Sequence, residues 1–171
     1  PEIDRQVRQP PKRHFLAGML KIWKQDDWAG ALDDFNREID AHPDFADAYN
    51  LRGLTKQKLG DVDGALVDFE KAVALEPDDA GYLCNRAEIR RRKNDWAGAL
   101  ADYDRSIELN PDEPQALNKR GFTKKKLGDV AGALADFDRA VELDPLLVAA
   151  FKNRGDVKRA MKDFKAAIAD Y

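Results

Sequence analysis

The chain contains 171 residues, of which 43% are hydrophobic and 36% charged, and its net charge is −3 at pH 7. This near balance of charge argues against a protein dominated by binding to nucleic acid or to anionic membranes. The single cysteine, Cys84, excludes an intrachain disulfide, and no apolar run approaches the roughly 20 residues that span a bilayer. We therefore expect a cytoplasmic protein.

Residues 1–11 precede the regular part of the sequence. Within them, Pro10 and Pro11 disfavour a helix just before the pair. The sequence therefore predicts a short, extended, non-repeat lead-in.

From residue 12 onwards the sequence repeats with a period of 34 residues. Alanines occur 34 apart, each is followed four residues later by an aromatic ring, and prolines keep the same spacing. The alanines are Ala31, Ala65, Ala99, Ala133 and Ala167; the rings are Phe35, Phe69, Tyr103, Phe137 and Tyr171; the prolines are Pro43, Pro77, Pro111 and Pro145. Repeats of this length stack so that each buries its apolar face against its neighbours. We expect repeats over 12–45, 46–79, 80–113 and 114–147, and a partial repeat over 148–171.

Each repeat contains two helical patterns. In 46–79, the first helix ends at Leu59, Gly60 suits a left-handed cap, and Asp61 can cap the next helix. The second helix runs to about Leu75, before the turn at Pro77. We expect small residues where the two helices approach closely, namely at Gly30-Ala31, Gly64-Ala65, Gly98-Ala99 and Gly132-Ala133.

The positions of these residues carry a family resemblance. Each repeat has an aromatic residue or leucine near its fourth position, a small residue at the eighth, alanine at the twentieth, a ring at the twenty-fourth and proline at the thirty-second. This pattern resembles the tetratricopeptide repeat and covers residues 12–171 as a single array. The resemblance implies an all-α fold, a right-handed superhelical α-solenoid of helix-turn-helix repeats, that binds proteins and is not an enzyme.

An arginine and an aspartate recur together at the seventh and twenty-third positions. The pairs are Arg52 with Asp68, Arg86 with Asp102, Arg120 with Asp136, and Arg154 with Asp170. A guanidinium and a carboxylate on two packed helices can form a bidentate pair, so we predict an internal ladder that holds the helix pairs in register. The first repeat breaks the pattern, with Gly18 opposite Asp34.

In the family, the ligand surface is concave and is lined by the first helix of each repeat. Carried over to this sequence, the partner-binding surface contains an asparagine in each of four repeats, several cations and two apolar residues. The predicted residues are Asn50, Leu54, Lys58, Asn85, Arg91, Arg92, Asn118, Lys119, Phe122, Lys125, Lys126, Asn153 and Arg159.

Side-chain amides offer both a donor and an acceptor, so the asparagines could hold the backbone of an extended peptide. The cations could attract acidic side chains, although cations in the last turn of a helix also complement the helix dipole. We therefore predict a protein-interaction module for an extended or acidic peptide or protein segment.

Other functions remain open at this stage. A multivalent or self-associating scaffold is the main alternative, since exposed terminal repeats could stack on one another. Binding to anionic membrane or nucleic acid is less favoured, because little aromatic stacking accompanies the cations. His14 and His42 have no triad or metal-ligand spacing, and nothing near Cys84 resembles a base. The sequence therefore predicts no catalysis and no cofactor.

Overall fold

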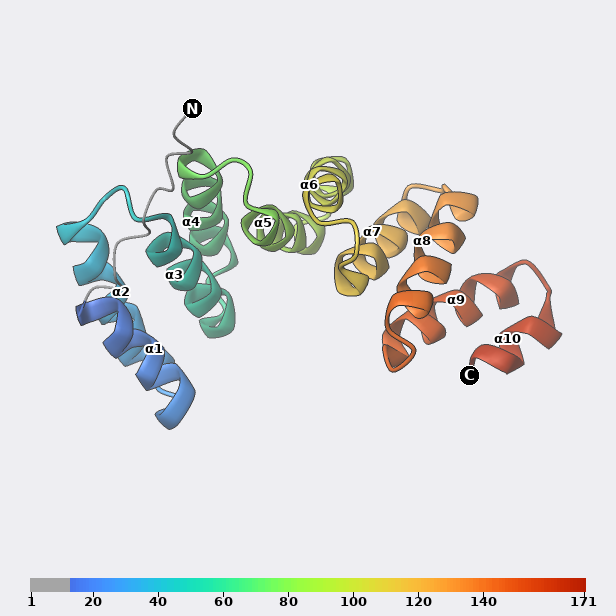
Figure 1. Ribbon diagram of the computed structural model, residues 1–171, viewed down its shortest axis with the longest axis horizontal. Helices are drawn as coiled ribbons and strands as arrows, with labels where there is room; N and C mark the ends of the chain where they lie inside the picture. Colours follow the sequence, from blue (N-terminus) through green and yellow to red (C-terminus); the bar gives the residue numbers. More distant parts are fainter. Residues whose placement is uncertain (1–12) are drawn as a thin grey trace, which may run out of the picture. The chain divides into compact units, whose positions relative to one another are not determined.

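The structure, a computed structural model, describes residues 13–171; the predicted lead-in over residues 1–11 lies outside the described part of the chain. Over 13–171 it contains ten α-helices and no strand (Figure 1). The helices are α1 (Arg13–Gln25), α2 (Trp28–Ala41), α3 (Ala46–Leu59), α4 (Val62–Leu75), α5 (Ala80–Arg92), α6 (Trp96–Leu109), α7 (Pro114–Lys126), α8 (Val130–Leu143), α9 (Val148–Ala160) and α10 (Phe164–Asp170). None of these helices is long and apolar enough to cross a membrane. The all-α prediction is confirmed.

The helices belong to two compact units. Unit 1 is Pro1–Leu75, in which α1 packs with α2 and α3 with α4. Unit 2 is Glu76–Tyr171, in which α5, α7 and α9 pair with α6, α8 and α10 respectively (Figure 1). Each pair is one helix-turn-helix repeat, as the 34-residue period predicts.

Each of the first four repeats is built around one aromatic ring of its second helix, whereas the equivalent ring of the fifth, Tyr171, directly follows α10 and is exposed. Phe35, Phe69, Tyr103 and Phe137 are completely buried. A glycine of the first helix lies against the ring in four repeats; a Cβ on Gly53, for example, would come within 2.8 Å of Phe69 Cε1. Close packing of this kind lets two helices approach without a void. The small residue predicted at the eighth position is therefore the one that lets the helices meet.

The turn between the two helices of a repeat has a fixed design. The first helix of the second and fourth repeats is followed by a glycine with positive φ, Gly60 at 91° and Gly128 at 89°, as a left-handed cap requires. An aspartate then caps the second helix, and its carboxylate accepts from the backbone N–H three residues later. The capping pairs are Asp27 with Gly30, Asp61 with Gly64, Asp95 with Gly98, Asp129 with Gly132 and Asp163 with Ala166.

This cap corrects one prediction, because the glycines three residues after the aspartates do not mediate helix packing. A Cβ on Gly64 would lie 2.1 Å from Asp61 Oδ2, the capping carboxylate. The neighbouring Ala65 is completely buried and is the residue that packs between the helices. Ala166 occupies the glycine's place in α10 with the cap bond retained at 3.1 Å, so the position tolerates a methyl group.

The first repeat also departs from the predicted alignment. Gly18 lies against Phe35 as Gly53 lies against Phe69, so Gly18 is not the residue that replaces the ladder arginine. That place belongs to Ala17. Asp27 N donates to Lys21 O, six residues back, whereas Asp61 N donates to Lys56 O, five residues back. The end of α1 therefore contains one additional residue, which a fixed period of 34 could not reveal.

Candidate partner-binding surface

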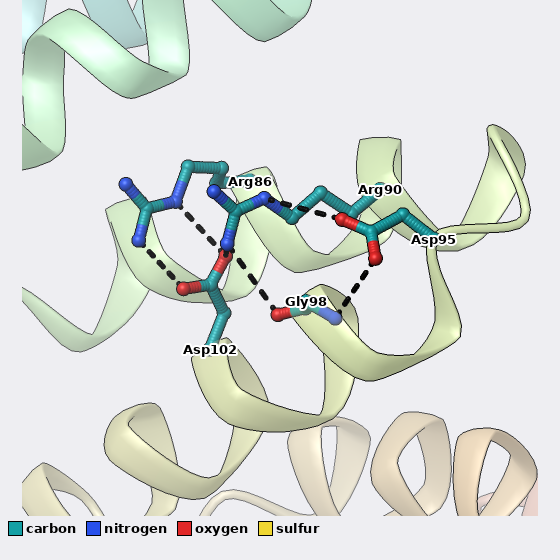
Figure 2. Close-up of polar contacts among 5 residues, drawn as sticks. All are labelled: Arg86, Arg90, Asp95, Gly98 and Asp102. Carbon is teal, nitrogen blue, oxygen red and sulfur yellow. Dashed lines mark hydrogen bonds and ion pairs between the residues drawn. The ribbon is translucent and has the colours of Figure 1, made fainter. Parts of the chain in front are cut away.

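The predicted arginine–aspartate ladder is present and contains a second cation. In the third repeat, Arg86 Nε and Nη2 donate to Asp102 at 2.9 and 2.6 Å (Figure 2). One turn further along α5, Arg90 Nη1 donates to the same carboxylate at 2.9 Å. The Asp102 side chain is only 5% exposed, so two cations enclose a buried anion. A buried carboxylate needs such compensation, because its desolvation is costly.

The same three-residue cluster recurs through both units. Its members are Arg52, Lys56 and Asp68; Arg120, Lys124 and Asp136; and Arg154, Lys158 and Asp170. In the first repeat, Lys21 is the one cation of residues 13–171 that binds Asp34, at 2.7 Å. The cations at the eleventh position of the second to fifth repeats therefore belong to the scaffold, since each is paired with a buried carboxylate.

Three of the ladder arginines also reach the preceding repeat. Arg120 Nη1 donates to Asp104 at 3.0 Å, and Arg154 Nη1 donates to Asp138 at 2.8 Å. In unit 1, Arg52 Nη1 donates to Asn36 at 3.0 Å. Each of these three guanidinium groups thus joins the two helices of its own repeat and also binds the preceding repeat. Arginine can do this because, unlike lysine, it has several N–H donors in a fixed planar arrangement.

On the partner-binding surface predicted for α5, two cations are already neutralised. Glu88 accepts from Arg91 at 2.7 and 3.0 Å and from Arg92 at 3.2 Å, and Tyr103 donates its hydroxyl to Glu88 at 3.3 Å. Burial opposes ionisation of Glu88, but the two guanidinium groups outweigh it and lower the pKa of this carboxyl. Glu88 therefore stays ionised and holds Arg91 and Arg92 at neutral pH.

The cations of α7 are in a different state. Within the described part of the chain, Lys119 and Lys125 form no ion pair, whereas Lys124 between them binds Asp136. On the neighbouring α9, Asn153 donates to Asn118 at 2.8 Å, so the predicted asparagines of these two repeats pair with each other across the repeat boundary. Arg159, further along α9, binds Asp156 at 3.4 Å. The uncompensated positive charge on this surface lies mainly on α7.

An aromatic cluster borders these lysines. Phe122 lies 6.4 Å from Trp96 between ring centroids, and both Arg91 and Lys126 approach the Phe122 ring, at 5.4 and 5.6 Å from its centroid. Lys126 also lies 5.9 Å from the Trp96 centroid. Cations over aromatic faces are held by cation–π attraction, so Phe122 is shielded by charged side chains and not openly apolar.

Unit 1 repeats part of this arrangement and adds apolar exposure. Lys58 lies 5.6 Å from the Trp28 ring centroid, as Lys126 does over Trp96, and Asn50 and Leu54 are both half-buried on α3. On α1, however, Leu16, Leu20 and Trp23 are 44%, 50% and 88% exposed. Their spacing of three and four residues places them on one helix face.

Comparison with known proteins matches this architecture. Two models of the tetratricopeptide repeat family match residues 46–79 and 86–162. A search of curated protein sequences found no match.

Solved structures resemble the whole fold. MamA from Desulfovibrio magneticus RS-1 is similar with a TM-score of 0.83 at 15% identity, over 94% of this chain and 93% of that one. PilF from Pseudomonas aeruginosa gives 0.83 at 16% identity, over 92% and 72%. YrrB, described as having an unusual peptide-binding site, gives 0.78 at 20% identity, over 94% and 82%. At such identities the likeness establishes the fold alone.

Proposed function

Because the chain belongs to the tetratricopeptide repeat family, a family of protein-interaction modules, we propose that it binds an acidic, extended segment of a partner protein. The proposed surface lies on the first helices of unit 2, α5, α7 and α9, and is called the first-helix face below. Its residues are Asn85, Arg91, Arg92, Asn118, Lys119, Phe122, Lys125, Lys126, Asn153 and Arg159. In unit 1, Asn50, Leu54 and Lys58 occupy the corresponding positions on α3.

One observation carries this proposal: Lys119 and Lys125 lie on the first-helix face without an ion pair to any residue in 13–171. In the ladder, by contrast, the buried carboxylates of Asp102 and Asp136 are each paired with an arginine. Two ammonium groups without an ion pair on one helix contribute to a positive potential that attracts carboxylates and speeds their capture. The Asn118–Asn153 pair beside them retains donors and acceptors for a peptide backbone.

The test measures binding of two fluorescent peptides of equal length, one rich in glutamate and one rich in lysine. The glutamate peptide should bind and should weaken as salt rises, because the contact is electrostatic. The double variant Lys119→Glu and Lys125→Glu should lose this binding. Lys165→Glu, an exposed change on α10, should retain it. Equal binding of both peptides, or equal loss in both variants, would refute an acidic ligand on α7.

A second candidate, a self-associating scaffold, is favoured by the exposed α1 face of Leu16, Leu20 and Trp23. Adjacent exposed apolar residues are typical of contact surfaces. Sedimentation velocity over a range of concentrations tests this candidate. Association that Trp23→Glu abolishes would support it, whereas a monomer at all concentrations would exclude it.

A further inference from the structure

A pocket of about 220 Å³ opens between α5 and α7. Its walls are formed by Ala80, Gly81, Cys84 and Asn85 of α5, by Ser106 and Asn110 at the end of α6, and by Glu113, Gln115 and Ala116 at the start of α7. Small-molecule sites usually enclose roughly 300–1,000 Å³. The pocket is therefore of a size for one amino-acid side chain, not for a cofactor.

The repeat register shows why a space exists here. The residues around this space can be compared with those at the equivalent places in other repeats, namely the residue that caps the next first helix and the residue aligned with Cys84 on the preceding one. Between α1 and α3 these residues are Phe45 and Phe15, whose ring centroids are 4.9 Å apart. Between α7 and α9 the capping residue is Leu147, which packs against an apolar cluster that includes Ala116 and Leu117.

Between α5 and α7 the same two positions hold Glu113 and Cys84. The Glu113 carboxylate accepts from Gln115 N at 3.4 Å, so it turns back onto its own helix and does not fill the space. The cysteine side chain is too short to replace a phenylalanine ring. The chain thus places an apolar capping residue, Phe45 or Leu147, at two junctions and a glutamate at the third.

We propose that this pocket receives one apolar side chain, of leucine to phenylalanine size, from the bound partner segment. The inference rests on the proposed function, since the pocket lies at the edge of the first-helix face. The charged neighbours do not favour an ion: Glu113 lines the pocket, and the charge of Lys119 acts on Cys84 from the next turn of α7. An apolar residue in the pocket would place the adjoining residues of the segment beside Lys119. The ligand is thus an apolar anchor next to acidic residues.

Cys84 allows a direct test, because it is the only cysteine of the chain. Thiol–disulfide exchange places an isobutyl, an aminoethyl or a carboxyethyl thiol on Cys84, and each exchange releases one free thiol of the reagent. Each attached group is called a thiol cap here. The concentration of reductant that removes half of a thiol cap measures how strongly the pocket holds that group. The isobutyl cap should require about tenfold more reductant than either charged cap, since a hydrophobic pocket discriminates apolar groups by roughly that factor or more.

Matched variants isolate the pocket. Glu113→Leu introduces the residue type that Leu147 provides at the start of α9, and Gly81→Leu adds a side chain to the pocket wall, where a Cβ would lie 3.1 Å from Asp79 Oδ1. Both should abolish the preference for the isobutyl cap. A reference protein with Cys84→Ala and Lys165→Cys, whose thiol is exposed, should show no preference. Equal retention of all caps on Cys84, a preference for a charged cap, or an unchanged preference in both Glu113→Leu and Gly81→Leu would overturn the inference.

The acidic-ligand surface and the apolar pocket can be refuted independently of each other. A protein that binds the glutamate peptide but shows no cap preference retains the acidic surface and lacks the apolar pocket. A protein with the cap preference but without peptide binding retains the pocket and refutes the acidic surface.

Discussion

Arg120 and Asp136 form a bidentate ion pair across the fourth repeat, with nitrogen–oxygen distances of 2.6 and 2.9 Å. The remaining amino group of Arg120 donates to Asp104 of the repeat before it. Hydrogen bonds to the carboxylate of Asp136, outweighing partial burial, raise the pKa of Arg120. One side chain therefore couples the folding of one helix pair to that of its neighbour, which is where the stability of a repeat protein lies.

Replacing this arginine should destabilise the fold. Arg120→Met leaves the Asp136 carboxylate buried with Lys124 as its remaining cation, and we expect a loss of about 3 kcal/mol in the free energy of unfolding. Arg139→Met removes an exposed arginine that binds Asp112 and Glu142, and should cost less than about 1 kcal/mol. Urea unfolding of both variants measures the difference. Similar losses in the two would refute the ladder's structural role, and so would a large loss of peptide binding in folded Arg120→Met.

Two glycines of the same repeat should respond differently to substitution by alanine. A Cβ on Gly121 would lie 2.8 Å from Phe137 Cε1 and 3.1 Å from the Ala133 carbonyl oxygen, so the ring and the backbone of α8 would have to shift. Overpacking of this kind should reduce the free energy of unfolding by about 1 kcal/mol or more. The three atoms nearest to a Cβ on Gly132 all belong to the Asp129 side chain, and the gain in helix propensity should offset that contact. Thermal unfolding should therefore show a lower Tm for Gly121→Ala and little change for Gly132→Ala.

The last ladder carboxylate predicts a pH dependence. Burial opposes ionisation of Asp170, but hydrogen bonds from Arg154 and Lys158 outweigh it and lower the pKa of Asp170. A carboxyl with a lowered folded-state pKa stabilises the fold above its unfolded pKa of about 3.9, and this contribution is lost as pH falls through the folded value. The stability difference between wild type and Asp170→Asn should be full at neutral pH and should shrink below about pH 4. A difference that stays constant down to about pH 2 would contradict this origin.

Glu88 should weaken binding of an acidic partner. It neutralises Arg91 and Arg92 on the first-helix face, so a ligand carboxylate must compete with it. Glu88→Gln should therefore tighten binding of the glutamate peptide about fivefold, or about 1 kcal/mol, with a steeper salt dependence. Glu108→Gln, which removes an exposed carboxylate that binds Arg105 on α6, is the control and should change affinity little. Unchanged affinity in Glu88→Gln would mean that the ligand does not contact these arginines.

Only part of the candidate site could be predicted from the sequence. Arg91 and Lys125 are both cations at the twelfth position of their repeats, so the repeat pattern does not distinguish them. The structure separates them, because Glu88 lies one turn from Arg91 whereas no carboxylate of the described chain pairs with Lys125. Ion pairing depends on side-chain direction and on the neighbouring helix, which residue type and spacing do not specify.

The sequence by itself determined the ten helices, their pairing and the ladder, because each repeat buries its apolar residues only against its nearest neighbours in the chain. Phe137 and Ala133 could be assigned to the core from their period alone. Tertiary structure decided the extra residue at the end of α1, the capping role of Gly64 and the pocket beside Cys84. Each of these depends on which atoms fill a given space, and packing of that kind is fixed only when the helices meet.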